Sequence, residues 1–141
     1  MSENAEKAFA LFREVEGKET ATGDWMEINQ EIINQFADVT LDHQFIHVDP
    51  EKAKATPFGT TIAHGFLTLS LLTHLGASAT PENPDPARFK GIVMGVNYGF
   101  EKVRFVSPVK VGSRIRAHSL LSKVELKANA IQQTRTMTIE I

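Results

Sequence analysis

Two periods of hydrophobic and polar residues run along this chain, one typical of helices and one typical of strands. In residues 2–17, apolar side chains recur every three or four positions, and Ser2 can cap the helix that this spacing predicts. A second helix is predicted after Asn29, which can cap it. From residue 91 onwards, side chains alternate every second position instead, and this pattern predicts strands.

The strand-like part contains three runs, residues 91–106, 114–125 and 130–141, which are separated by turn-forming residues. Consecutive long strands joined by short turns predict an antiparallel meander. In the first run, bulky residues alternate with glycine and asparagine, so one face of this predicted strand is nearly bare. Glycines inside a strand often mark the close approach of another element or a ligand.

Before these strands, residues 62–76 are apolar on nearly every side, which is typical of a helix surrounded by the rest of its protein. Together with long antiparallel strands that carry a bare stripe, this helix predicts an α+β fold. In that fold, an antiparallel sheet is wrapped around a central apolar helix. The first helix covers the far face of the sheet only partly. We therefore expect a homodimer, which would protect the exposed sheet surface and edges.

A length of 141 residues fits one domain, residues 1–141, with the helix of residues 1–17 packed on it. The formal net charge of −2 gives no overall basic field, so neither nucleic acid nor a membrane is an expected partner. The absence of cysteine excludes disulfides, thiolate catalysis and cysteine zinc sites. The N-terminal residues lack the basic start and apolar stretch of a secretory signal, so we expect a cytoplasmic protein.

Candidate chemistry gathers in the polar loop before the apolar helix. Asp42 and His47 lie five residues apart, close enough for both side chains to hold one water molecule. The backbone at Gly65 then opens the helix, whose positive end faces incoming negative charge. His43 and His47 have the spacing of zinc-binding HExxH helices. However, Gln44 stands where the essential glutamate would be, so we expect no metal.

These residues form two linked motifs that resemble the signature of the MaoC-like hydratase family, and within it the nodulation protein N-like branch. The family pattern is approximately Ser/Thr-Gly-Asp-x-Asn-Pro-Ile-His-x-Asp, followed by Ala-His-Gly-Met/Phe at the start of the central helix. Leu41 replaces the glycine, Gln44-Phe45 replaces Asn-Pro, and the chain ends at Ile141, where the family usually continues into a final strand. The resemblance covers residues 25–141, and the matching residues are Thr40, Asp42, Ile46, His47, Asp49, Ala63, His64, Gly65 and Phe66.

The resemblance implies a hot dog fold and a lyase of fatty acid metabolism. The implied reaction is hydration of a trans-2-enoyl thioester of coenzyme A to the (R)-3-hydroxyacyl product, or the reverse dehydration. Carried over by position, Asp42 and His47 would be catalytic, and the Gly65 amide would bind the thioester oxygen. Either side chain can take the proton of the water while the other orients it. Water supplies both the hydroxyl and the proton, so no cofactor is expected, and coenzyme A is part of the substrate.

Three further residues, His64, Thr73 and Asn97, are candidates for binding the substrate, and each also has a structural explanation. His64 can hydrogen-bond the helix entry, Thr73 can bond back within its own helix, and Asn97 lies on the bare strand face. Two other functions suit the same scaffold. A hot dog thioesterase directs water at the carbonyl carbon, and a non-catalytic binding module holds an acyl thioester without turnover. The motifs specify neither the acyl length, nor the carrier, nor the direction.

Overall fold

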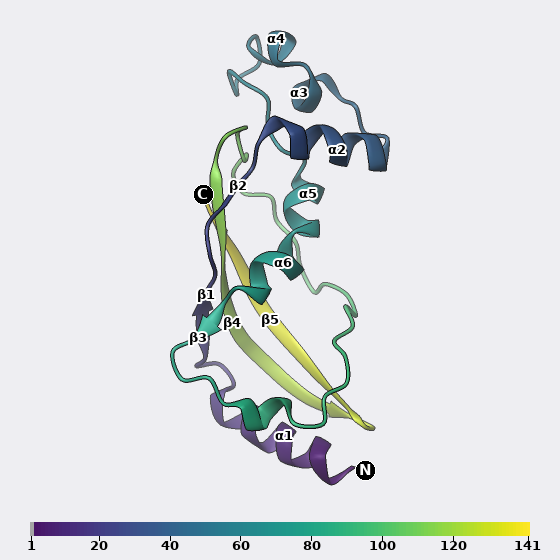
Figure 1. The fold of residues 1–141 in the computed structure, drawn as a ribbon, viewed down its shortest axis with the longest axis vertical. Helices are drawn as coiled ribbons and strands as arrows, with labels where there is room; N and C mark the ends of the chain where they lie inside the picture. Colours follow the sequence, from purple (N-terminus) through teal and green to yellow (C-terminus); the bar gives the residue numbers. More distant parts are fainter. Residues whose placement is uncertain (1) are drawn as a thin grey trace.

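The computed structural model describes residues 2–141 as an antiparallel sheet with helices at both ends and along one face (Figure 1). The N-terminal helix lies near the tip of the long C-terminal hairpin, and the loop with the candidate residues lies at the other end. In chain order, the elements are α1 (Glu3–Val15), β1 (Thr20–Thr22), β2 (Met26–Glu27), α2 (Gln30–Thr40), α3 (Phe45–Val48), α4 (Pro50–Ala53), α5 (Gly65–Ser70), α6 (Leu72–Ala77), β3 (Thr80–Pro81), η1 (Pro86–Phe89), β4 (Arg114–Lys127) and β5 (Ala130–Glu140).

Polar side chains begin three of the helices, and two of these caps are predicted above. Ser2 begins α1 and Asn29 begins α2, and each side chain accepts a hydrogen bond from a main-chain N–H, at 3.2 and 2.9 Å. Asp49 does the same for α4 at 3.1 Å, with Pro50 as the first helical residue. These caps satisfy donors that a helix leaves unpaired, which explains why the local sequence predicts both helix starts.

The two long strands that follow residue 113 are confirmed, and they form the centre of the sheet. β4 pairs with β5 from Arg116–Glu140 to Lys127–Ala130, in antiparallel register, with one irregularity between Leu121 and Lys123. The other edge of β4 pairs with β1 and β2, and β3 pairs with β1. The sheet therefore has five antiparallel strands, of which only two are long.

Two apolar clusters hold the helices on this sheet. Phe12 of α1 is fully buried against Leu121 and Val124 of β4, which fixes the N-terminal helix at one end of the sheet. The larger cluster joins α2, α5 and α6 to the base of β4 and to the segment before it. Its buried members are Ile28, Ile33, Ala63, Leu67, Leu75, Val109, Ile115 and Ala117.

The predicted apolar helix is present as two consecutive segments, α5 and α6, separated by Leu71. The main-chain hydrogen bonds continue through this residue, since its N–H bonds the Leu67 carbonyl and its carbonyl bonds the Leu75 N–H. The expectation that this helix is surrounded is wrong for the residues described. Leu67 and Leu75 are buried in the cluster that includes the sheet, whereas Phe66 is 67% exposed.

The prediction of a strand over residues 91–106 is also wrong in this structure. The segment forms neither a helix nor a strand, and it winds from η1 towards β4 apart from the sheet (Figure 1). Val93 and Tyr98 are 88% and 90% exposed. Alternation of side chains favours an extended backbone, but a strand also needs a neighbouring edge, and local sequence does not specify that edge. Among residues 2–141, no helix has the length and apolar character needed to cross a membrane.

Candidate active site

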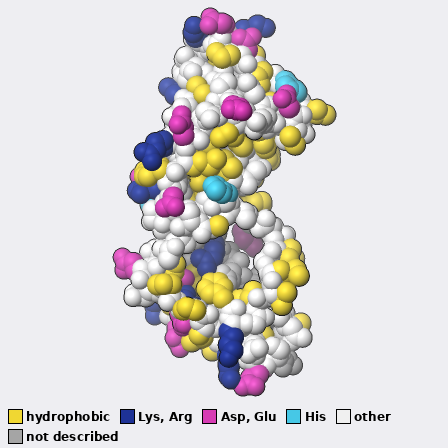
Figure 2. All heavy atoms as spheres, in the orientation of Figure 1, with side chains coloured by type: hydrophobic (Ala, Val, Ile, Leu, Met, Phe, Trp, Pro, Cys, Tyr) yellow, Lys and Arg dark blue, Asp and Glu magenta, His cyan; other side chains and the backbone are white. Residues whose placement is uncertain are grey.

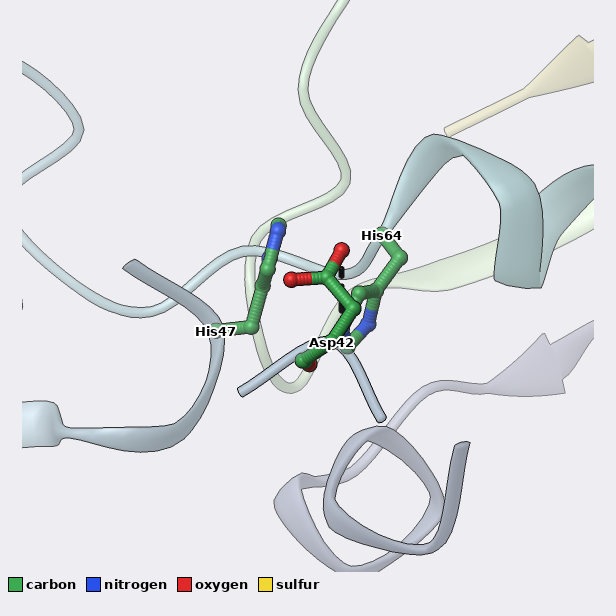
Figure 3. Close-up of side chains that lie close together, drawn as sticks. All are labelled: Asp42, His47 and His64. Atoms are coloured by element: carbon green, nitrogen blue, oxygen red, sulfur yellow. Dashed lines mark hydrogen bonds and ion pairs between the residues drawn. The ribbon is translucent and has the colours of Figure 1, made fainter. Parts of the chain in front are cut away.

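Three side chains from three separate segments meet at the end of the molecule that carries α2 and α3. Asp42 lies in the turn after α2, His47 lies in α3, and His64 immediately precedes α5 (Figure 3). One polar atom of each side chain lies within 4.8 Å of the corresponding atoms of the other two. Figure 3 shows the Asp42 carboxylate directed towards the two imidazoles. The structure thus brings together the two predicted catalytic side chains and one predicted substrate-binding residue.

Asp42 is placed by the way in which α2 ends. The preceding residue, Leu41, has a φ of 64°, a left-handed conformation that turns the chain out of the helix. The Asp42 side chain accepts a hydrogen bond from the main-chain N–H of Gln44 at 3.3 Å. Its side chain is 54% exposed, so the carboxylate contacts both the buried imidazoles and solvent. A charged carboxylate at such a boundary can accept a hydrogen bond from a water molecule.

His47 is buried, and a single hydrogen bond determines which ring nitrogen is free. Its Nδ1 lies 2.7 Å from the main-chain oxygen of Ile62. Because a carbonyl oxygen can only accept, Nδ1 carries the proton and Nε2 is left as an acceptor. The ring is 7% exposed, so this tautomer is held inside the protein.

The pKa of His47 is lowered from its ordinary value. Burial is the main cause, because it disfavours the charged imidazolium, and the neighbouring His64 acts in the same direction. The Ile62 carbonyl and the Asp42 carboxylate oppose the shift. The net effect favours a neutral His47 at neutral pH, which is the form able to accept a hydrogen bond at Nε2.

A polar network that the sequence does not indicate holds the main chain of His47. Gln30, the first residue of α2, donates from its Nε2 to the His47 carbonyl at 2.7 Å. The hydroxyl of Thr61, which is fully buried, donates to Oε1 of Gln30 at 2.6 Å. One glutamine therefore links α2, α3 and the segment that leads to α5. Neither residue lies in the linked motifs, so no local signal points to this network.

Gly65 is the first residue of α5, and the space at its Cα is already occupied. A Cβ built on Gly65 would lie 2.9 Å from the ring of Phe105. That distance is shorter than side-chain contacts allow, so glycine is the residue that fits against this ring. Phe105 also packs on Phe66, with ring centroids 5.7 Å apart. Phe105 comes from the unpaired region before β4 and is a neighbour of Gly65 that the sequence analysis missed.

His64 is stacked on His47, with ring centroids 3.8 Å apart and an interplanar angle of 24°. Its Nε2 lies 2.9 Å from the main-chain oxygen of Asp42, so this nitrogen donates and does not offer a lone pair. Nearly parallel rings also direct their nitrogen lone pairs side by side rather than towards one point. Nε2 of His64 is therefore not available as a ligand for a metal ion held together with Asp42 and His47.

The other two predicted substrate-binding residues lie elsewhere. Thr73 is in α6, two turns beyond Gly65, and its side chain is exposed. Asn97 is in the exposed irregular segment of residues 91–106, and its neighbours Val96 and Tyr98 are 78% and 90% exposed. The role of Thr73 and Asn97 in binding a substrate stays a prediction.

The site offers two acceptors for one small molecule. Hydrogen bonds to water span about 2.7–3.2 Å, so groups separated by up to 4.8 Å can share one water molecule. A water held by a carboxylate and a neutral imidazole is oriented, and either group can accept its proton. A main-chain N–H at the start of α5 follows directly after His64. This combination suits reactions in which water adds to a bond next to a carbonyl group.

Known proteins resemble this chain in sequence and in fold. The family described as "MaoC like domain" matches residues 12–140. Nodulation protein N of Rhizobium meliloti is 49% identical over 127 residues, which cover 89% of this chain and 75% of that protein. The 3-hydroxyacyl-thioester dehydratase Z of Mycobacterium tuberculosis is 50% identical over 126 residues, which cover 89% of this chain and 79% of that protein.

A solved structure, the (R)-hydratase from A. caviae, matches this chain with a TM-score of 0.60 and 24% identity, covering 85% of this chain and 80% of that one. At this level of identity the likeness concerns the fold. The predicted α+β architecture is therefore confirmed as the hot dog fold, in which an antiparallel sheet packs against a helix.

Proposed function

The chain belongs to the MaoC-like dehydratase family, and on that premise we propose that it hydrates trans-2-enoyl thioesters to (R)-3-hydroxyacyl thioesters or catalyses the reverse dehydration. The family relationship assigns it to the hydro-lyases. The proposal adds the substrate, the stereochemistry and the catalytic residues.

The observation that carries the proposal is the position of the Asp42 carboxylate beside the imidazole of His47, whose Nε2 is left as an acceptor. In the hydration direction, the oxygen of the shared water forms a bond to C3 of the enoyl group. One of the two side chains accepts the proton that this water loses, while the other holds its oxygen. General acid and base assistance of this kind typically contributes about 10²–10⁴-fold to the rate.

The main-chain N–H of Gly65 is proposed to stabilise the negative charge that develops on the thioester oxygen. As water adds, the electron pair of the double bond moves to form an enolate, and negative charge develops on the thioester oxygen. A fixed N–H aimed at this oxygen lowers the barrier because the charge is greater in the transition state than in the substrate. A proton is then delivered to C2. Water thus supplies both the hydroxyl and the proton that are added, and no redox or group-carrying cofactor takes part.

A thioester substrate is also supported by a relative, since dehydratase Z of M. tuberculosis is named for action on 3-hydroxyacyl thioesters. We propose coenzyme A as the carrier, which would be part of the substrate and not a resident cofactor.

The exposed apolar side chains of residues 91–106 support a second copy of this chain as a partner. Val93, Val96, Tyr98 and Phe100 of this segment are 66–90% exposed. Figure 2 shows the molecule hollowed between the segment and the sheet.

The test uses purified protein and a series of trans-2-enoyl-CoA substrates of increasing chain length, beginning with crotonyl-CoA. Hydration removes the conjugated double bond, so absorbance of the enoyl thioester should fall without release of free thiol. Chiral analysis of the product should give the (R)-3-hydroxyacyl thioester. Release of thiol would instead identify a thioesterase, and tight binding without turnover would identify a binding module. Light scattering of the same preparation measures whether the protein is a dimer.

A further inference from the structure

The side chain of His64 contacts both members of the proposed catalytic pair. Its Nε2 donates to the main-chain oxygen of Asp42 at 2.9 Å, and its ring lies face to face with the ring of His47. It is 3% exposed, and Phe36 of α2 packs on it with ring centroids 5.0 Å apart. His64 also immediately precedes Gly65 in the chain. One buried imidazole therefore touches the carboxylate loop, the catalytic ring and the start of α5.

The unused nitrogen of this ring indicates that the imidazole is present for a specific contact. Nδ1 of His64 is buried and has no hydrogen-bond partner in the described chain. Leaving a buried polar atom unpaired costs free energy, which an apolar ring of similar shape would avoid. The gain that offsets this cost is the hydrogen bond from Nε2 to Asp42. That bond ties the main chain of the Asp42 turn to the start of α5, whereas the Asp42 side chain makes a longer contact with the Gln44 N–H within the turn.

We propose that His64 is the positioning residue of this site. Its N–H holds the Asp42 turn and its ring face holds the imidazole of His47. The Asp42 carboxylate and the His47 imidazole can then both hydrogen-bond one water beside Gly65. A misplacement of reacting groups by about 1 Å can cost on the order of 10²-fold in rate, so this positioning affects turnover. The inference rests on the proposed function and replaces the substrate-binding role predicted for His64 from the sequence, because its Nε2 is already engaged and its ring is buried.

Two substitutions separate the two contacts of His64. His64→Phe keeps a ring that can stack on His47 but removes the donor to the Asp42 carbonyl. His64→Gln keeps an N–H near the position of Nε2 but removes the stacked ring. His43→Gln is the matched control, because His43 is next to Asp42 in the chain but is half exposed and pairs with Asp38 at 2.8 Å.

In enoyl thioester hydration, His64→Phe should lower kcat by about 10- to 100-fold with little change in KM, because the side chain of His64 is buried. His64→Gln should recover part of this loss, because it restores the donor. His43→Gln should match the wild type. If His64→Phe fails to fold, the comparison of His64→Gln with the wild type and with His43→Gln takes its place.

An NMR titration of the histidine rings provides a readout that does not require turnover. The titratable groups that act on the pKa of His47 are Asp42, which raises it, and His64, which lowers it. Replacing His64 by phenylalanine keeps the ring of His47 covered but removes the second imidazole. His64→Gln also removes it, but only His64→Gln keeps the donor that holds the Asp42 turn. The pKa of His47 should therefore be higher in His64→Gln than in His64→Phe, because the Asp42 carboxylate that raises it stays in place, whereas His43→Gln should leave the wild-type value unchanged.

The inference is overturned if His64→Phe retains the kcat of the wild type. It is also overturned if the variant loses thermal stability while kcat and the pKa of His47 stay the same, since that result describes a purely structural residue. If the wild-type protein hydrates no enoyl thioester, the proposed function fails instead. In that case equal pKa values of His47 in His64→Phe and His64→Gln overturn the positioning role, and a higher value in His64→Gln supports it.

Discussion

His47 donates its Nδ1 proton to the main-chain oxygen of Ile62 across 2.7 Å. Ile62 lies three residues before Gly65, in the segment that leads into α5. The strand-like path of this segment thus orients the imidazole, and its continuation provides the main-chain N–H proposed to bind the thioester oxygen. The bond also leaves Nε2 as the free acceptor of the ring.

Because of this hydrogen bond, His47→Asn tests most directly whether Nε2 of His47 is needed for catalysis. The asparagine amide can still donate to the Ile62 carbonyl from a position close to Nδ1, but it has no atom at Nε2. We expect kcat to fall by about 10²–10⁴-fold while the thermal midpoint stays within a few degrees. Steady-state kinetics and thermal unfolding of the same preparation measure both quantities. Full activity in His47→Asn would show that Nε2 is not required.

The proposed role of Gly65 can be tested by comparing two substitutions. Proline is tolerated at the first position of a helix, and the extended conformation of His64, with φ −59° and ψ 136°, suits a following proline. Both Gly65→Ala and Gly65→Pro place a Cβ against Phe105, but only proline lacks the N–H. We expect kcat of Gly65→Pro to be lower than that of Gly65→Ala by on the order of 10²–10³-fold. Equal kcat values would exclude the N–H from catalysis.

The lowered pKa of His47 predicts the acid side of the pH profile. The neutral ring is the active form, so kcat/KM should rise with pH through the pKa of His47. The midpoint of this rise should lie below the ordinary histidine value of about 6.5. His47→Asn should lack this acid limb. An acid limb centred above the ordinary value in the wild type would contradict the account.

The same shift predicts how stability depends on pH. Because the folded protein binds this proton less tightly than the unfolded chain, the contribution of His47 to stability is complete above about pH 6.5. It is lost as the pH falls towards the lower pKa of the folded state. Thermal midpoints measured across this interval should therefore fall less in His47→Asn than in the wild type.

Stability can be changed without changing the site, because α1 packs at the other end of the sheet (Figure 1). Phe12 is fully buried there and meets Phe89 edge to face, with centroids 5.6 Å apart. Phe12→Ala should cost about 3–5 kcal/mol of unfolding free energy, and the half-buried Phe9→Ala should cost less. Denaturant unfolding measures both values, and kcat per folded molecule should stay at the wild-type level.

The features that the sequence predicts correctly are those determined by neighbours in the chain. Helix starts at Ser2 and Asn29 depend on caps within a few residues, and the β4–β5 hairpin depends on alternation on both sides of one short turn. The grouping of Asp42 and His47 also follows from local spacing in a loop. The match of the two motifs to the family adds the hot dog fold.

The features that the sequence does not predict depend on contacts across the fold. Residues 91–106 carry a strand pattern, but pairing needs an edge whose position the local sequence does not specify. The contact of Phe105 with Gly65 joins positions forty residues apart, and the contact of Gln30 with His47 joins α2 to α3. Such contacts arise from packing, so a pattern read along the chain does not reveal them.

The central claim is that Asp42 and His47 direct one water at C3 of an enoyl thioester, and labelled water tests it most directly. In H₂¹⁸O, crotonyl-CoA should yield a 3-hydroxyacyl thioester with the label on the hydroxyl at C3. Incorporation should fall to the background rate in Asp42→Asn and His47→Asn. The claim is contradicted if the label appears in a free carboxylate together with released thiol, or if the wild type incorporates no label from any chain length of enoyl-CoA.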